Sequence, residues 1–417
     1  MFAGWIVVGV AFLIATFAFG IGFYGVGLYM VVLHDRLGWP VSLISMAITG
    51  YYVLSAAMIT VVGDAFDRFG PRRVLLVAIG GLAGGVLLIA STARPWQLGL
   101  GLAVMAVGWA GMSGAGINAI VAPWFERKRG LAVSMAMNGA TCGGVLIVPL
   151  WAALIPRLGL RGAALVVVGL MLVVLVPLVG RFMHRGPEVF GLGPDGDSRP
   201  VPAAPAGSAA PAGSTAPAGA SSAAPREIAP LRRAGLVRTR RFWTISAAFA
   251  LGLLAQVGFI THQVAYLSPR LGREGAALAV SLTTLAAILG RLATGAFVDR
   301  IDRRRAASCN FALQALAVFA MIRWPSVPVL YLGCVIFGLG VGNMTTFPSL
   351  IVQVEYPKEH FRRVVSLVVA INQFTFAFGP ALLGWARDRW GSYSIALGLC
   401  LVCEAAAAII VLLRGKR

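Results

Sequence analysis

One arginine lies where a charged side chain is costly. Arg291 lies inside the apolar stretch 276–298, about two helical turns from its end. A charge at that depth in a membrane is rarely tolerated without a partner or a water-filled cavity. A guanidinium keeps its proton and offers two parallel donors to a carboxylate. We therefore expect Arg291 to bind an anionic solute, the alternative being a structural arginine that bonds backbone carbonyls.

Other polar side chains within apolar segments could complete such a site. Each could equally form a hydrogen bond between helices; they are Tyr24, Asn118, Asn138, His262 and Asn372. His262 could also relay protons. Glu404 is the only acid deep within an apolar segment, which makes it a second candidate for proton coupling, against a purely structural hydrogen bond.

The sequence offers no pattern typical of an enzyme, a metal site or a cofactor site. It has no Walker-type Gly-Lys-Ser/Thr, no nucleophile elbow and no His and Cys set at metal-ligand spacing. Cys400 and Cys403 have C-x-x-C spacing, but in a continuous apolar helix this spacing places two small residues on one face. We therefore expect no catalysis, no cofactor and no metal.

The composition indicates the elements that must position these residues. Of the 417 residues, 59% are hydrophobic and 12% are charged, whereas a soluble domain has about 25% charged residues. The net charge of +20 comes from short basic clusters between apolar runs, not from one basic face, so we expect no nucleic acid partner. The chain is expected to be an integral membrane protein.

Twelve apolar segments are long enough to span a bilayer. They are approximately 5–33, 41–63, 74–92, 97–122, 131–155, 162–183, 242–267, 276–298, 306–322, 329–354, 364–385 and 393–413. Because they lack polar alternation, they predict helices and not barrel strands. The first is too long for a signal peptide, so we expect it to remain as a span.

The basic residues predict the orientation. Alternate loops, with the central connection and the C-terminal tail, hold 25 of the 35 Lys and Arg residues, and the opposite loops hold nine. Positive charge accumulates on the cytoplasmic side. We expect both termini in the cytoplasm, a plasma (bacterial inner) membrane location and a monomer.

The spans form two sixes, 1–183 and 242–417, joined by 184–241. The halves repeat at an offset of 232 positions: Gly63, Asp67-Arg68 and Arg72-Arg73 recur as Gly295, Asp299-Arg300 and Arg304-Arg305. Such a repeat is typical of a transporter with its site between the halves. We expect Asp67-Arg68 and Asp299-Arg300 to act as cytoplasmic gates, because exposed ion pairs of about 0–1 kcal/mol can open in every cycle.

The connection has two parts. The stretch 199–225 is rich in Pro, Ala, Gly and Ser and lacks the apolar residues needed for a core, so it predicts a mobile tether. The stretch 231–241 is basic and mildly amphipathic. We expect it to lie on anionic lipid headgroups, the alternative being plain positive-inside charge.

The stretch 63–73, Gly-Asp-Ala-Phe-Asp-Arg-Phe-Gly-Pro-Arg-Arg, resembles the loop signature of the major facilitator superfamily. Four further features resemble its monocarboxylate porter and oxalate/formate antiporter group: Gly4-Trp5, the run 123–132, the run 185–196 and Arg291 in the eighth span. The resemblance implies an all-α membrane fold of two pseudo-symmetric six-helix halves, with Arg291 pairing with a substrate carboxylate. The listed polar residues would lie on cavity-lining helices.

Three departures limit what the resemblance implies. Ala287 stands where proton-coupled members often have an aspartate, and 364–385 lacks the lysine of oxalate exchangers. The segment 97–122 lacks the arginine expected of drug exporters. We expect a secondary transporter or exchanger of a small organic monoanion, by alternating access, with no steep proton coupling. The alternatives are an efflux pump for amphipathic compounds and a transport-dead sensor.

Overall fold

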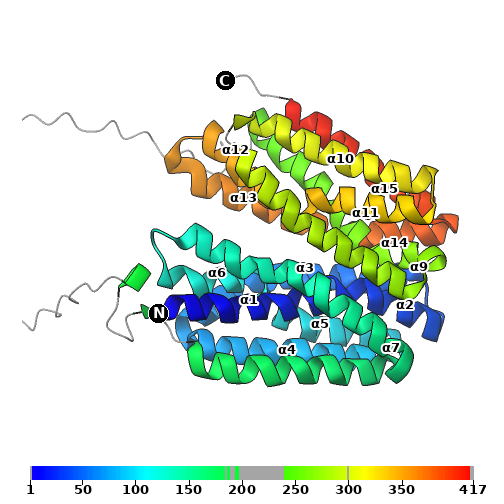
Figure 1. Cartoon of the computed structure of the whole chain (residues 1–417), viewed down its shortest axis with the longest axis horizontal. Coiled ribbons are helices and arrows are strands. Elements are labelled where there is room, and N and C mark those ends of the chain that lie inside the picture. The colour runs from blue at the N-terminus through cyan, green and yellow to red at the C-terminus, as the bar shows by residue number, and fades with distance from the viewer. Residues whose placement is uncertain (1, 184–185, 188–192, 197–238, 298–299, 414–417) are drawn as a thin grey trace, which may run out of the picture.

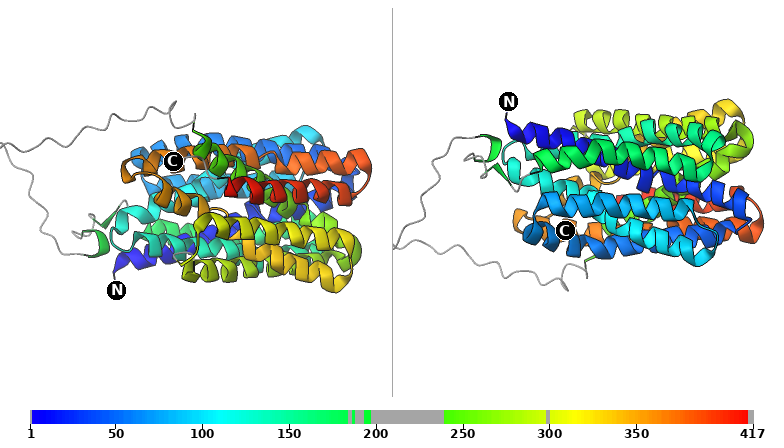
Figure 2. Two further views of the ribbon diagram at one scale, coloured as in Figure 1. Left: turned by 90° about the horizontal axis from the view of Figure 1, so that it is seen from above. Right: turned by 90° about the horizontal axis from the view of Figure 1, so that it is seen from below.

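The computed structural model describes residues 2–183, 186–187, 193–196, 239–297 and 300–413, and almost all of them are helical. Two bundles lie side by side, with the N-terminal half below and the C-terminal half above in Figure 1. The helices run along a common direction in all three views (Figure 2). The predicted all-α architecture of two six-helix halves is confirmed.

The N-terminal half is built from α1 (Ala3–Gly22), α2 (Gly25–Leu37), α3 (Val41–Phe69), α4 (Pro71–Ala90), α5 (Pro95–Met112), α6 (Gly114–Val121) and α7 (Arg129–Phe182). The C-terminal half is built from α9 (Arg240–Phe297), α10 (Arg303–Arg323), α11 (Val327–Val341), α12 (Phe347–Glu355), α13 (Lys358–Phe376), α14 (Gly379–Trp390) and α15 (Tyr393–Leu412). The described spans extend a few residues beyond the predicted apolar segments, because charged terminal turns continue the helices.

Two of these helices each cross the membrane twice. In the described part of the chain, nine helical stretches are long and apolar enough to span a bilayer. Of these, α7 and α9 fold back at Gly159 and Gly272, whose φ angles of 68° and 72° suit a residue without a Cβ. Together with the interrupted span α11–α12, these stretches give twelve crossings.

Four spans are interrupted near their middle. The breaks fall at Phe23–Tyr24 between α1 and α2, at Ser113 between α5 and α6, at 342–346 between α11 and α12, and at 377–378 between α13 and α14. Non-helical backbone at membrane depth is tolerated only where protein or a water-filled cavity surrounds it. The breaks therefore mark where an internal site can lie.

The two halves are joined at the end remote from the N-terminus, which we call the far end. The Arg273 guanidinium pairs with Asp35 at 2.6 Å, and Asp388 accepts the backbone N–H of Ser42 at 2.7 Å. Deeper in, Thr49 accepts the backbone N–H of Ala381 at 3.1 Å. These contacts close the far end, where α2, α3, α9 and α14 meet (Figure 1).

At the opposite, linker end, three of the motifs singled out in the sequence come together. The Asp195 carboxylate accepts backbone N–H groups of Glu126 and Arg127 at 3.1 and 2.8 Å, and these bonds, that of Arg127 foremost, lower the pKa of Asp195. The ring of Phe125 packs edge-on against Phe2 and Trp5. The chain start, the α6–α7 loop and the segment after α7 thus form one cluster.

The central connection lies between α7 and α9. α7 ends at Phe182 and α9 begins at Arg240. The predicted tether 199–225 lies outside the described residues, as does all of the predicted surface segment 231–241 except its last three residues. Both stay predictions.

Candidate functional site

A cavity of about 260 Å³ lies between the halves at the level of the helix breaks. The interrupted spans line it with Phe23, Tyr24, Ser113, Gly342 and Phe376. Arg291 lines it from the second crossing of α9. Of the described residues in its lining, Arg291 alone is charged.

Arg291 is oriented by the interrupted backbone opposite it. Its Nε donates to the carbonyl of Gly342 at 3.2 Å, at the first residue of the break between α11 and α12. One guanidinium edge is thereby fixed, which leaves the terminal nitrogens free to meet a ligand. Tyr24 lines the same cavity from the N-terminal half. Two residues predicted for the site, Arg291 and Tyr24, therefore lie in one cavity.

Aromatic rings form the wall that faces this charge. Trp109 packs edge-on against Phe19 at 4.8 Å between ring centroids and stacks on Phe23 at 6.2 Å. Phe23 packs edge-on against Tyr24 and Tyr52. These five rings line the cavity from the N-terminal half, and Phe376 of the C-terminal half adds a sixth, packed edge-on against Tyr52. Sequence reasoning missed this wall, because aromatic residues are common throughout the apolar segments.

Residues at equivalent positions of the two sequence repeats line the cavity. Shifting a lining residue of the N-terminal half by 232 positions repeatedly gives a lining residue of the C-terminal half. The pairs are Tyr24 and Gln256, Ser55 and Ala287, Ile59 and Arg291, Trp109 and Val341, Ser113 and Thr345, and Thr141 and Gln373. The cavity therefore lies where the two repeats face each other, as is typical of substrate sites in duplicated transporters.

The other predicted site residues do not line this cavity in the described conformation. Asn118 is exposed and donates to the carbonyl of Gly114 at 3.0 Å, and Asn138 is half-buried. Asn372 is buried, and its Oδ1 has no partner among the described residues. His262 is buried between the carbonyl of Pro380 at 2.9 Å and the hydroxyl of Tyr393 at 3.1 Å. Substrate binding by these four stays a prediction.

Glu404 lies in a buried polar chain that reaches the cavity. Gln314, with its amide turned to suit its neighbours, donates to Glu404 Oε1 at 2.8 Å and accepts from the backbone N–H of Val341 at 3.3 Å. In the other orientation, the same amide nitrogen donates to Gln256 Oε1 at 3.3 Å, and Gln256 lines the cavity. Glu404 is fully buried, and its Oε2 has no partner among the described residues. Gln314 therefore lies between this acid and the cavity-lining Gln256.

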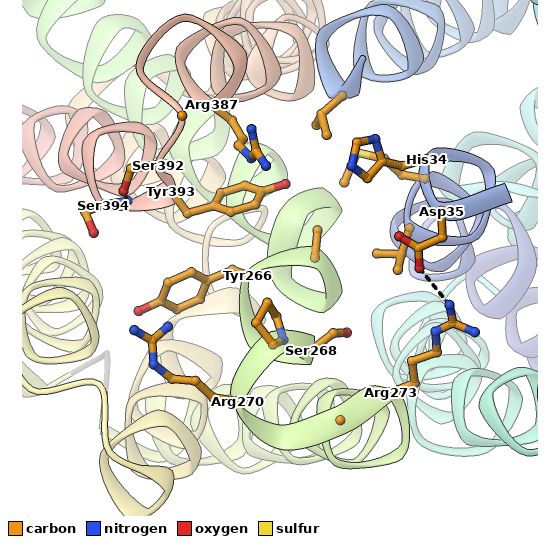
Figure 3. A pocket seen from close by; sticks show the side chains of 17 residues that line it. His34, Asp35, Tyr266, Ser268, Arg270, Arg273, Arg387, Ser392, Tyr393 and Ser394 are labelled. Atoms are coloured by element: carbon orange, nitrogen blue, oxygen red, sulfur yellow. Dashed lines mark hydrogen bonds and ion pairs between the residues drawn. The ribbon is translucent and has the colours of Figure 1, made fainter. Parts of the chain in front are cut away.

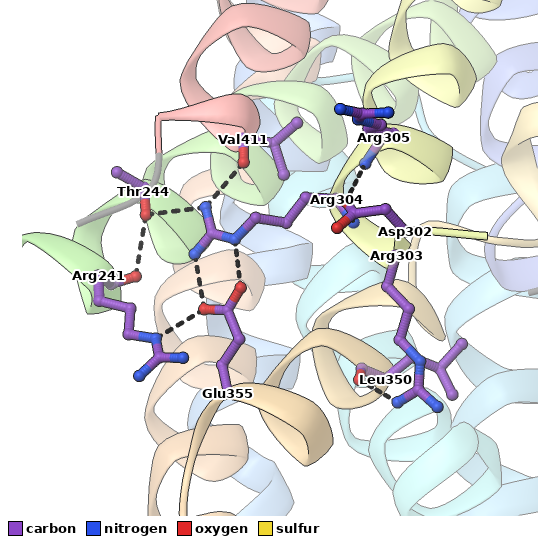
Figure 4. A network of polar contacts seen from close by, with 9 residues as sticks. All are labelled: Arg241, Thr244, Asp302, Arg303, Arg304, Arg305, Leu350, Glu355 and Val411. Atoms are coloured by element: carbon purple, nitrogen blue, oxygen red, sulfur yellow. Dashed lines mark hydrogen bonds and ion pairs between the residues drawn. The ribbon is translucent and has the colours of Figure 1, made fainter. Parts of the chain in front are cut away.

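A network of charges at the linker end of the C-terminal half was not foreseen (Figure 4). Arg304 is only 2% exposed, and two of its nitrogens donate to the Glu355 carboxylate at 2.5 and 2.9 Å. It also donates to the carbonyl of Val411 at 2.7 Å, and Arg241 pairs with Glu355 at 2.8 Å. Four helices are joined in this way. The basic pair 304–305 could have indicated a charged site at this end, but nothing in the sequence identified Glu355 as the partner of Arg304.

The predicted gate residues are at the same end. Asp67 and Arg68 are exposed in the last turn of α3, and Arg300 is exposed just after α9. Asp299 lies outside the described residues. Their gating role stays a prediction.

A model of the Major Facilitator Superfamily matches residues 12–360 and 264–417. The chain belongs to the major facilitator superfamily. Superfamily members are transporters and not enzymes, so the expectation of a non-enzymatic transporter is confirmed. The fold, the repeat and the cavity all agree with this membership.

Named relatives include a monocarboxylate transporter, an efflux protein and a further transporter of the superfamily. Monocarboxylate transporter 11 of Mus musculus is 26% identical over 95% of this chain and 84% of its own length. The fujikurins efflux protein of Gibberella fujikuroi is 28% identical over 83% of this chain and 68% of its own length. An MFS-type transporter 1 of an Ophiocordyceps species is 25% identical, and the chain spans 60% of that relative's length.

Solved structures share the fold at low sequence identity. A mutant of the nucleoside transporter NupG matches with a TM-score of 0.73 and 11% identity, covering 97% of this chain and 99% of that one. A bacterial homologue of the human lysosomal transporter Spinster, in an inward-facing and unoccupied conformation, matches with a TM-score of 0.69 and 14% identity over 98% and 95% of the two chains. These similarities show the superfamily fold.

Proposed function

We propose that this transporter moves a small amphipathic monoanion, a monocarboxylate with an aromatic or branched apolar body, by alternating access. The observation that supports this most is the opposition of Arg291 to five aromatic rings in one cavity. A single guanidinium suits a single carboxylate, because two parallel N–H donors match its two oxygens. The rings offer the rest of the molecule an apolar surface, and aromatic pairs favour edge-on or offset stacking.

The volume of the cavity limits the size of the cargo. At about 260 Å³ it lies just below the usual range of ligand-pocket volumes, about 300 to 1,000 Å³. The cargo is therefore a small acid. The relative named as a monocarboxylate transporter supports the carboxylate, and the aromatic rings of the lining support an apolar body, which is why we prefer this class to small hydrophilic acids.

The proposal includes an orientation. If the basic loops and both termini are cytoplasmic, the far end faces outward, and the contacts Asp35–Arg273 and Ser42–Asp388 close the outer mouth. The described conformation is then closed to the outside. The plasma membrane remains our proposed location.

A thermal-stability titration of the purified protein tests the cargo class. We expect benzoate to raise the melting temperature in a saturable way, since a ligand at 100 times its Kd adds about 2.7 kcal/mol of stability. Acetate lacks the ring and benzyl alcohol lacks the charge, so both should act more weakly. Equal stabilisation by benzyl alcohol and benzoate would contradict the anion proposal and favour efflux of neutral amphipathic compounds.

The buried chain from Gln256 to Glu404 supports a second proposal, that Glu404 carries a coupling proton. An acid within a membrane span that connects to the substrate site is a common feature of proton-coupled transport. The test is uptake into proteoliposomes under an imposed pH gradient. Glu404→Gln should abolish uphill uptake but keep exchange of labelled for unlabelled substrate. If the wild type shows no gradient-driven uptake, the exchanger predicted from Ala287 is correct and this proposal is wrong.

A further inference from the structure

A second polar cavity opens between the halves at the far end, with a volume of about 630 Å³ (Figure 3). We call it the far vestibule. The N-terminal half lines it with His34 and Asp35 from α2, and the C-terminal half lines it with Arg270, Arg273 and Arg387, among others. It is separate from the central cavity, because the two share no lining residue.

Arginines are concentrated around the far vestibule. The loops at this end of the molecule hold nine of the 35 basic residues, and three of those nine line this one cavity. Arginines elsewhere at this end have structural bonds, such as Arg36 to the carbonyl of Thr92 and Arg161 to that of Ser91. A membrane orientation set by positive charge on the other side does not require a cationic cluster here.

The charges of the far vestibule are only partly balanced. Arg273 pairs with Asp35 at 2.6 Å, and Arg387 lies 3.7 Å from Asp388, whose other oxygen accepts the Ser42 N–H. Arg270 makes no hydrogen bond or ion pair with the described residues and stands beside Tyr266. Three guanidiniums therefore face one lining carboxylate and one carboxylate adjacent to the lining, which leaves an excess of positive charge.

The Arg387 guanidinium is already directed into this space. Figure 3 shows it and the His34 imidazole pointing toward the same region. His34 Nδ1 donates to the carbonyl of Trp39 at 2.7 Å, so Nε2 is left for the vestibule and donates to an anion when the imidazole is protonated. Arg387 is held over the Tyr393 ring, with its guanidinium carbon 5.8 Å from the ring centroid, which limits its freedom before any ligand arrives.

We propose that the far vestibule binds a small oxyanion at Arg387, with Arg270, Arg273 and the protonated form of His34 supplying further positive charge. The ligand chemistry is that of a carboxylate, phosphate or sulfate group, since guanidinium donors match planar or tetrahedral oxygen sets. Both halves line the vestibule, so its geometry depends on the closed far end. An anion bound there stabilises the conformation closed at this end, because a ligand favours the state to which it binds more tightly.

The test uses the full-length Arg291→Gln variant in detergent, so that the central site cannot contribute. Melting temperature is titrated with sulfate, phosphate, acetate or benzoate, against chloride at equal ionic strength. We expect a saturable rise with at least one oxyanion. Adding Arg387→Gln should weaken the apparent affinity at least tenfold, whereas adding Arg389→Gln, an exposed neighbour outside the lining, should leave it within twofold. If Arg387→Gln fails to fold, Arg387→Lys takes its place, and it should weaken the apparent affinity by a smaller factor, because an ammonium cannot present two parallel donors.

The outcomes separate the possible sources of the anion. A response to sulfate or phosphate identifies an inorganic oxyanion site, and a response to acetate or benzoate identifies a site for the same chemical class as the proposed cargo. No saturable response beyond chloride, or equal responses in the Arg387→Gln and Arg389→Gln variants, overturns the proposal. The central-site proposal is judged separately, because a carboxylate response that persists in Arg291→Gln but is lost on adding Arg387→Gln belongs to the vestibule, whose lining does not include the central cavity.

Discussion

The two halves present different chemistry to the same cavity. At equivalent positions of the repeat, the N-terminal half places Ile59 and Trp109 where the C-terminal half places Arg291 and Val341. The N-terminal half therefore contributes five of the six aromatic rings in the lining, and the C-terminal half contributes the charge and Phe376. A duplicated fold can thus divide recognition, with one repeat binding the body of an amphipathic anion and the other binding its carboxylate.

The two halves also differ in the buried residues that lie behind the cavity lining. Gln314 and Glu404 of the C-terminal half correspond in the repeat to Leu82 and Leu172. At the linker end, Arg304 is buried against Glu355, whereas its counterpart Arg72 is exposed, because the position equivalent to Glu355 is Pro123. The C-terminal half therefore contains the buried polar networks, and its counterpart positions in the N-terminal half pack without them.

The strongest test of this division removes the charge. Arg291→Gln should abolish carboxylate binding with folding largely kept, since losing one partner of a buried charge pair costs about 2–5 kcal/mol, or about 30-fold to several thousand-fold in affinity. Arg291→Lys should restore only part of the affinity, because an ammonium cannot present two parallel donors. Binding by the folded Gln variant within about threefold of wild type would show that the charged wall is not the anchor.

The linker-end networks can be compared by a matched pair of variants. Arg304→Gln should lower the free energy of unfolding by about 1–3 kcal/mol, because Glu355 loses its hydrogen bonds to Arg304 but keeps its ion pair with Arg241. The control is Arg305→Gln, since Arg305 is exposed and bonds Asp302 through its backbone N–H. Melting curves of the two purified variants give the comparison. Equal losses of stability in both would mean that the buried contact is not what stabilises this end.

The aromatic wall should affect selectivity more than overall affinity. Trp109→Ala should weaken benzoate binding about 2- to 10-fold and leave acetate binding nearly unchanged, because an aromatic pair contributes about 0.5–1.5 kcal/mol beyond its buried area. Trp385→Ala, at a half-exposed position outside the cavity, is the control. Equal weakening of both acids by Trp109→Ala would indicate a collapsed cavity and not a ring contact.

The smallest effect is expected outside both halves. Deleting about half of residues 199–225 should leave transport near normal, because a stretch of this composition cannot bury enough surface to fold. Transport by proteoliposomes that contain the shortened protein gives the measurement. A stable, inserted deletion variant that no longer transports would show that the connection does more than join the halves.

The sequence predicted the architecture and singled out Arg291, the charged residue that lines the cavity, but it did not predict the full lining. The twelve spans and the offset of 232 followed from long apolar runs and basic loops, which are strong signals. Arg291 was predictable because a buried charge is rare, and Tyr24 because its helix lines the cavity in the resembling family. Asn118 and Asn372 were equally plausible, yet they lie elsewhere, because a helix that is apolar all round gives no signal of which face points inward. The helix breaks were missed for a similar reason, since glycines occur throughout these segments.

The sharp turn at Gly272 also bears on how the protein enters the membrane. Because α9 reverses at one residue with a φ of 72°, its two crossings form a helical hairpin with almost no loop. The second crossing contains Arg291, and an arginine at the centre of a span opposes insertion by roughly 2.5–3.5 kcal/mol. The first crossing, Phe242 to Leu267, contains no charged residue. During biogenesis, the two crossings should therefore insert as a pair, with the apolar helix carrying its charged partner into the bilayer.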